Sequence, residues 1–335
     1  VDLGRFSYLL DRLRRQQAQG NALVAKLPAA QHSEALAAPG PGPRPVRRLS
    51  FRLPVTHGQE PLRVEAMVPA QDANNRLVVI SHGLWDDPSS FEGWASHLVS
   101  HGYTVLLPAH PGSDYSQQQA MLAGKAAPPS PEDLRLRPLD VIAAVDAAAG
   151  GLEGLPAGLR TQDVVVLGHS WGATTALQLA GVRPSARRLE RYCHDRRNPN
   201  HNLSWVLQCS FLSSADRSDI SDPRVRAVVA VSPPMRLLFD TGASRGMNAR
   251  VLMVSGTRDW IVPSGPEAIE PMAQEARNIG GGHRLVLVEG GDHFNLRSPL
   301  ADGGGPLRGL LLAWVNEAFA AGSAAAPGPQ APDLL

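Results

Sequence analysis

The segment "VVVLGHSWGATTALQLA" (164–180) constrains the fold more than any other part of the chain. Its first four residues, 164–167, form an apolar, β-branched run that is typical of a fully buried strand. After Ser170 the apolar residues change to helical spacing and fall on one face, at Ala173, Ala176, Leu177 and Ala180. The chain therefore passes from strand to helix within a very short corner, and Ser170 stands at that corner.

Two glycines flank this corner. Gly168 and Gly172 carry no side chain, so the strand and the helix can approach each other there. Gly-x-Ser-x-Gly between a strand and a helix is typical of a nucleophile elbow, which exposes the serine hydroxyl and directs a helix N-terminus at developing negative charge. Ser170 is therefore the candidate nucleophile. The alternative is a chance match in a chain with 32 glycines.

The rest of the chain alternates strand and helix patterns, which predicts an α/β fold with a mostly parallel central sheet flanked by helices. We expect parallel strands at 77–81, 104–107, 164–167, 225–231, 251–254 and 285–288, and helices near 89–101, 131–149, 170–182, 265–279 and 305–321. Alternating segments at 46–53 and 62–68 predict an antiparallel pair at a sheet edge.

The domain boundaries follow from composition. Residues 1–45 are expected to form a helical segment and a Pro/Gly linker, residues 46–321 the main domain, and residues 322–335 a disordered tail. The connection 183–223 is too long for a plain crossover. We expect it to form a cap over the site, and we call it the cap insertion.

We expect the general base at the carboxyl ends of the parallel strands, because the functional residues of such sheets lie there. His293 follows the strand 285–288 in the loop "EGGDHFN", whereas His283 precedes that strand. Chains with a nucleophile elbow place the base last, and His293 is the last histidine. We expect His293 to be the general base; the alternative is a solvated loop histidine.

The acid is expected at the end of the strand 251–254, in "VLMVSGTRDWIVP". Asp259 follows that strand and could hold the imidazole in its reactive tautomer. The competing carboxylates are Asp240, which lies further from its strand, Asp292, which adjoins the base, and Glu289.

Two backbone N–H groups are expected to form an oxyanion hole, those of Trp171 and of Leu84 in "SHGLWDDPSS". Three more side chains are candidates for lining the substrate pocket: Trp85, Trp260 and His110. A structural role for His110 is the alternative, and Arg137 and Asp140 in "RPLDV" are expected only to pack against the sheet.

The composition limits the kinds of binding partner that the chain can have. A net charge of +1 implies no nucleic-acid partner, and no apolar run is long enough for an integral membrane segment. The only cysteines, Cys193 and Cys209, lack zinc-ligand spacing. We expect them to form a disulfide worth about 3 kcal/mol, with two buried thiols as the alternative. A disulfide would favour a periplasmic or secreted location, and free thiols a cytoplasmic one.

The motifs "SHGLWDD", "GHSWG", "GTRDWIVP" and "GGDHF" together resemble the α/β-hydrolase superfamily. The stretch 78–126 with "RPLDV" is similar to bacterial predicted dienelactone hydrolases, a group related to platelet-activating-factor acetylhydrolases and cutinases, and "NLSWVLQC" is similar to its cyanobacterial-type members. Two departures matter. Dienelactone hydrolases use a cysteine nucleophile where this chain has Ser170. The acid of the acetylhydrolases follows the sixth strand, where this chain reads "VVAVSPPM", so the role moves to Asp259, as in cutinases.

These residues predict a serine carboxylic-ester hydrolase that works through an acyl-enzyme and implies no metal or organic cofactor. Its partner would be a small-molecule or polymeric ester: a short acyl ester, a lipid or a polyester. A serine peptidase or amidase with the same triad remains an alternative, as does a non-catalytic binding scaffold.

Overall fold

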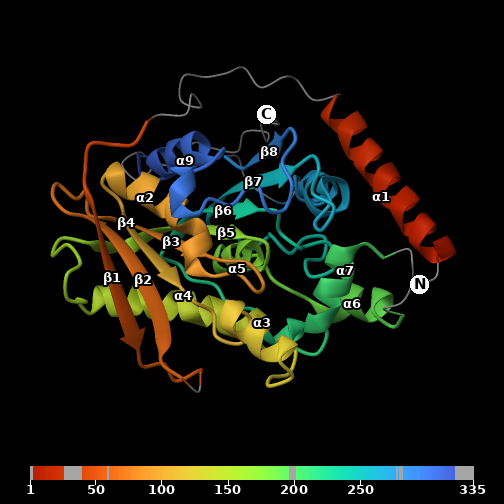
Figure 1. Cartoon of the computed structure of the whole chain (residues 1–335), viewed down its shortest axis with the longest axis horizontal. Helices are drawn as coiled ribbons and strands as arrows, with labels where there is room; N and C mark the ends of the chain where they lie inside the picture. The colour runs from red at the N-terminus through yellow and green to blue at the C-terminus, as the bar shows by residue number, and fades with distance from the viewer. Residues whose placement is uncertain are drawn as a thin grey trace.

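The protein is described from a computed structural model, which covers residues 3–25, 40–58, 60–195, 201–276, 278 and 282–320. Within these residues, eight strands form one sheet in the order β1-β2-β4-β3-β5-β6-β7-β8 (Figure 1). The strands are β1 (Val46–Leu53), β2 (Leu62–Pro69), β3 (Arg76–Ser81), β4 (Thr104–Pro108), β5 (Arg160–His169), β6 (Val225–Val231), β7 (Arg250–Gly256) and β8 (Arg284–Val288).

The sheet is parallel from β4 to β8, and β1 and β2 join it as an antiparallel pair at one edge. Both the edge pair and the parallel strands were predicted, with end residues that differ by a few positions. The central strands are apolar without alternation because helices cover both of their faces. Every residue of β4, for example, is buried.

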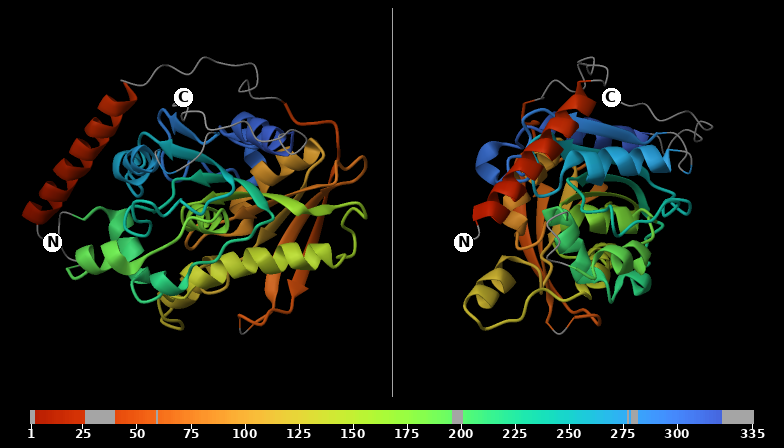
Figure 2. Two further views of the ribbon diagram at one scale, coloured as in Figure 1. Left: turned by 180° about the vertical axis from the view of Figure 1, so that it is seen from behind. Right: turned by 90° about the vertical axis from the view of Figure 1, so that its right-hand side faces the viewer.

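Helices cover the sheet on two sides (Figure 2). The helices of the described chain are α1 (Leu3–Val24), α2 (Glu92–Ser100), α3 (Tyr115–Leu122), α4 (Asp133–Ala149), α5 (Trp171–Leu179), α6 (Ala186–Tyr192), α7 (Leu203–Gln208), α8 (Glu270–Glu275) and α9 (Arg308–Ala320). One hydrophobic core lies between the sheet and α4, α5 and the cap insertion. A second lies between the opposite face and α2 and α9. This confirms the predicted α/β architecture.

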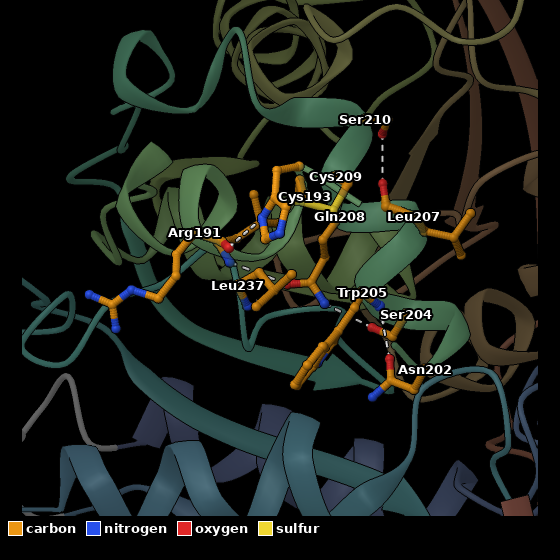
Figure 3. The surroundings of a disulfide bond; sticks show 12 residues. Arg191, Cys193, Asn202, Ser204, Trp205, Leu207, Gln208, Cys209, Ser210 and Leu237 are labelled. Carbon is orange, nitrogen blue, oxygen red and sulfur yellow. Dashed lines mark hydrogen bonds between the residues drawn. A yellow bond between two sulfur atoms is a disulfide. The ribbon is translucent and has the colours of Figure 1, made fainter. Parts of the chain in front are cut away.

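The cap insertion is folded in its described part. It contains α6, α7 and two 3-10 turns, η3 (Cys209–Phe211) and η4 (Ala215–Arg217). The predicted disulfide joins Cys193, after α6, to Cys209, after α7, with 5.4 Å between their Cα atoms (Figure 3). The cap insertion also has apolar contact with the elbow helix, because the rings of Phe211 and Trp171 lie 4.5 Å apart.

A buried polar contact anchors the cap insertion to the main domain. Gln208 accepts a hydrogen bond from the backbone of Leu237 (Figure 3). It also accepts one from the backbone of Leu238 and donates to the carboxylate of Glu267. Glu267 also accepts from the N–H groups of Met235 and Arg236, at 2.8 and 2.9 Å. These bonds fix α7 against the segments that follow β6 and β7.

Parts of the expected linker and tail lie outside the described residues, which omit 26–39 and 321–335. The N-terminal segment that precedes the linker is helical, as expected. Within the described chain, no helix is both long and apolar enough to cross a membrane.

Candidate active site

The corner between β5 and α5 has the geometry of an elbow. Ser170 has φ 54° and ψ −121°, a backbone conformation that side-chain-bearing residues rarely adopt. A Cβ added at Gly168 would lie 2.0 Å from the carbonyl oxygen of Gly172, and one added at Gly172 would lie 1.9 Å from that of Ser81. The two glycines therefore let α5 pack directly on β5 and on the end of β3.

His293 and Asp259 meet at the same edge of the sheet, although 34 positions separate them. The Nδ1 atom of His293 lies 2.9 Å from Oδ2 of Asp259. The other carboxylate oxygen accepts the N–H groups of Ile261 and Val262, at 3.0 and 2.8 Å. Asp259 is thus held by three hydrogen bonds, and Nε2 of His293 is left as the nitrogen that can accept a proton.

His169 links the elbow to this pair. Its ring lies next to the ring of His293, with 4.7 Å between the centroids, and its Nε2 donates to the backbone carbonyl of His293 at 2.8 Å. Burial lowers the pKa of His169 well below its usual value, so the ring stays neutral. Because His169 immediately precedes Ser170, the base is fixed relative to the serine. Among the hydrogen bonds of the described residues, none joins the Ser170 hydroxyl to His293.

The loop after β3 lies against the serine. A Cβ added at Gly83 would be 3.1 Å from the Cβ of Ser170. Hydrogen bonds within the described chain use neither the N–H of Leu84 nor that of Trp171. The two predicted oxyanion donors are therefore unpaired on the two segments that adjoin Ser170.

The candidate pocket residues differ in where they lie. Trp260 follows Asp259 and is 51% exposed, and Phe294 follows His293 and is 50% exposed. Each therefore places an exposed aromatic side chain one residue away from a member of the Asp259–His293 pair. Trp85 is half-buried, and its indole N–H donates to Oε1 of Gln117 on α3 at 2.8 Å.

His110 lies in the interior rather than on the surface of the site. It is fully buried, and its ring nitrogens lie 2.8 Å from Ser81 Oγ and 2.8 Å from Asp140 Oδ2. The expectation that His110 lines the substrate pocket is therefore wrong, because both nitrogens are already bonded inside the protein. Asp140 also contacts His57 Nε2 at 2.7 Å.

Arg137 does more than pack. Its fully buried guanidinium donates to Ser113 Oγ at 2.8 Å and to the backbone carbonyl of His82. Burial lowers the pKa of this guanidinium to about 10, which leaves it charged at neutral pH. The sequence patterns assigned no role to His169 or His82 and only a packing role to Arg137, because the roles of all three depend on contacts between distant segments.

Asp240, the leading competitor for the acid role, lies in a different ion pair. Its carboxylate lies 3.1 Å from Arg188 Nε and accepts from Ser185 Oγ at 3.1 Å. These contacts join Asp240 to the base of α6 rather than to His293.

Within the described part of the chain, no group of three or more His, Cys, Asp or Glu side chains is placed to hold a metal ion. The sequence model described as the alpha/beta hydrolase family matches residues 77–302, which is more than half of the chain. The match spans Ser170, Asp259 and His293 and both predicted oxyanion donors, Leu84 and Trp171. No curated protein matches the chain.

Proposed function

Since this chain belongs to the alpha/beta hydrolase family and is thereby a hydrolase, we propose that it is a serine carboxylic-ester hydrolase. The observation that carries the proposal is the contact between His293 and Asp259 at 2.9 Å, beside an elbow that holds Ser170 at φ 54°. These three groups have the residue types and the chain order of a Ser-Asp-His triad.

In the proposed reaction, Ser170 Oγ attacks the ester carbonyl while Nε2 of His293 takes its proton. The negative charge that develops on the carbonyl oxygen is stabilised by the N–H groups of Leu84 and Trp171. His293 then gives its proton to the leaving alcohol, and an acyl-enzyme remains. Water, deprotonated by His293, attacks the acyl carbon, and Ser170 regains its proton as the acid leaves.

Asp259 has a supporting role in this scheme. Its carboxylate keeps the proton on Nδ1 of His293 and stabilises the imidazolium that forms in each half-reaction. The two backbone N–H donors from Ile261 and Val262 hold the carboxylate in the orientation that this role needs.

The surroundings of the site support an ester with an apolar acyl part. Trp260 and Phe294 are exposed aromatic residues that adjoin Asp259 and His293 in sequence, and Phe211 of the cap insertion packs on Trp171. We further propose that the cap insertion limits the acyl chain that can enter, because the Cys193–Cys209 disulfide joins its two helices and Phe211 packs it against the elbow helix.

The test is hydrolysis of p-nitrophenyl esters of graded acyl length by the wild type and by Ser170→Ala. We expect turnover by the wild type and a loss of about 10⁴-fold or more in the variant, with the fold retained. Variant turnover within tenfold of wild type, with contaminating esterase excluded, would refute the assignment. A preference for matched anilides over esters would instead indicate an amidase.

A further inference from the structure

The loop that carries Leu84 contains a histidine, His82, whose two ring nitrogens are both hydrogen-bonded. His82 follows β3 and is fully buried within the protein. Its Nδ1 lies 2.8 Å from the carbonyl oxygen of Gly83, and its Nε2 lies 3.1 Å from the backbone nitrogen of His110.

These two partners fix the tautomer. A carbonyl oxygen only accepts a hydrogen bond, so Nδ1 of His82 carries the proton. A backbone N–H only donates, so Nε2 is bare and accepts from His110. Burial, reinforced by the nearby charge of Arg137, lowers the pKa of His82 to about 4, which keeps this neutral form throughout the neutral range.

The bond to Gly83 sets the direction of the next N–H. The carbonyl of Gly83 and the N–H of Leu84 belong to one peptide unit, and no described peptide bond is cis. In a planar trans peptide the C=O and N–H point in opposite directions. Nδ1 of His82, at 2.8 Å, and the longer bond from the N–H of Asp86, at 3.4 Å, hold this carbonyl on one side. The N–H of Leu84 is therefore held facing the other side.

The ring itself is held by a second layer of buried groups. His110, which donates to it, is fixed through its own ring by Ser81 and Asp140. Arg137 donates to the carbonyl of His82, so the peptide preceding Gly83 is fixed as well. The loop is thus restrained at two successive carbonyls, while the N–H of Leu84 stays unpaired.

We propose that His82 is a positioning residue that orients the Gly83–Leu84 peptide, so that the N–H of Leu84 points at the oxyanion formed when Ser170 attacks. The inference rests on the proposed ester hydrolysis. His82 does not contact the substrate; it acts through the backbone of the Gly83–Leu84 peptide. Loss of His82 therefore weakens binding of the transition state more than binding of the substrate.

The test uses variants that separate the two ring nitrogens. His82→Asn keeps an amide donor near the Nδ1 position, whereas His82→Gln keeps a polar group near Nε2 and removes that donor. His97→Leu is the matched control, because His97 is also buried with its pKa lowered to about 4, but lies on α2 with both ring nitrogens unpartnered. Circular dichroism melts verify folding, and His82→Leu replaces His82→Gln if the latter does not fold.

Two measurements distinguish positioning from general disruption. The first is kcat and KM for p-nitrophenyl butyrate. The second is a comparison of two inhibition constants. An alkyl trifluoromethyl ketone adds to the serine and places an oxyanion in the oxyanion hole, whereas the matching methyl ketone adds poorly. We expect His82→Gln to lower kcat by about 10- to 100-fold with KM nearly unchanged. Binding of the trifluoromethyl ketone to this variant should weaken by a similar factor, and binding of the methyl ketone should not change.

Recovery of most of the lost kcat in His82→Asn, and wild-type kinetics in His97→Leu, would complete the expected pattern. Equal weakening of both ketones, or unchanged binding of the trifluoromethyl ketone, would overturn the inference, as would His82→Asn no better than His82→Gln. A wild type that neither cleaves the ester nor binds the trifluoromethyl ketone would refute the proposed function instead, so the two failures are distinguishable.

Discussion

The backbone conformation at Ser170 predicts that glycine is more stable than alanine at this position, the reverse of the usual order within regular structure. At φ 54° and ψ −121°, a residue with a Cβ is strained by about 1–3 kcal/mol, whereas glycine adopts these angles without strain. Against this, a glycine variant is less stable than an alanine variant by about 0.5–1 kcal/mol, because glycine makes the unfolded chain more flexible. The free energy of unfolding of Ser170→Gly should therefore exceed that of Ser170→Ala by up to about 2.5 kcal/mol.

The assay is urea unfolding at pH 7, followed by circular dichroism. Both substitutions remove the same hydroxyl, so their difference contains the backbone strain and the burial of one methyl group. Ser255 on β7 is the matched control, because it is a buried serine in a regular strand. There both substitutions remove the bond to Ser264, and alanine should be the more stable by about 0.5–1 kcal/mol. An alanine variant at 170 as stable as the glycine variant would contradict the argument that the elbow is strained.

Three further predictions concern the acid, the cap insertion and pH. Asp259→Asn should lower kcat by about 10⁴-fold, and Asp240→Asn by little; the opposite order in steady-state kinetics would move the acid role to Asp240. Replacing Cys193 and Cys209 by serine opens a loop of 16 positions and should cost about 3 kcal/mol in urea unfolding. It should also broaden the accepted acyl lengths, and an unchanged length profile would refute control by the cap insertion. His82 has its folded pKa lowered to about 4, below the unfolded value of 6.5, so the unfolded chain binds the proton first as pH falls. This site should therefore lose about 2 kcal/mol of stability between pH 7 and pH 5. Burial raises the pKa of Asp133 to about 7, which shifts the total stability in the opposite direction. The measurement is therefore the difference between wild type and His82→Leu in urea unfolding, and a difference that does not change between pH 7 and pH 5 would contradict the prediction.

The parts of the fold that sequence patterns predict are those specified locally. The strands have continuous apolar runs because both faces are covered, and the β5–α5 corner has its glycines where backbones touch. Asp259 and His293 could be placed because both follow parallel strands, whose carboxyl ends share one edge.

Elements whose stability comes from distant contacts were missed. Helix α3 buries none of its residues and so has no apolar stripe in the sequence. Helices α6 and α7 are short, and the disulfide and the Gln208–Glu267 contact hold them. The position of His110 was predicted wrongly for a similar reason. His110 follows the end of a strand, but its ring lies in the interior, where it contacts Asp140 on α4.

The measurement that tests the central claim most directly is covalent labelling of the native protein with an alkyl fluorophosphonate, followed by peptide mass spectrometry. The account predicts one adduct per chain, located on Ser170. It also predicts that labelling slows by orders of magnitude in His293→Gln, because the serine loses its base. An adduct on any other residue, or equal labelling in His293→Gln, would contradict the assignment of Ser170 as a nucleophile activated by His293.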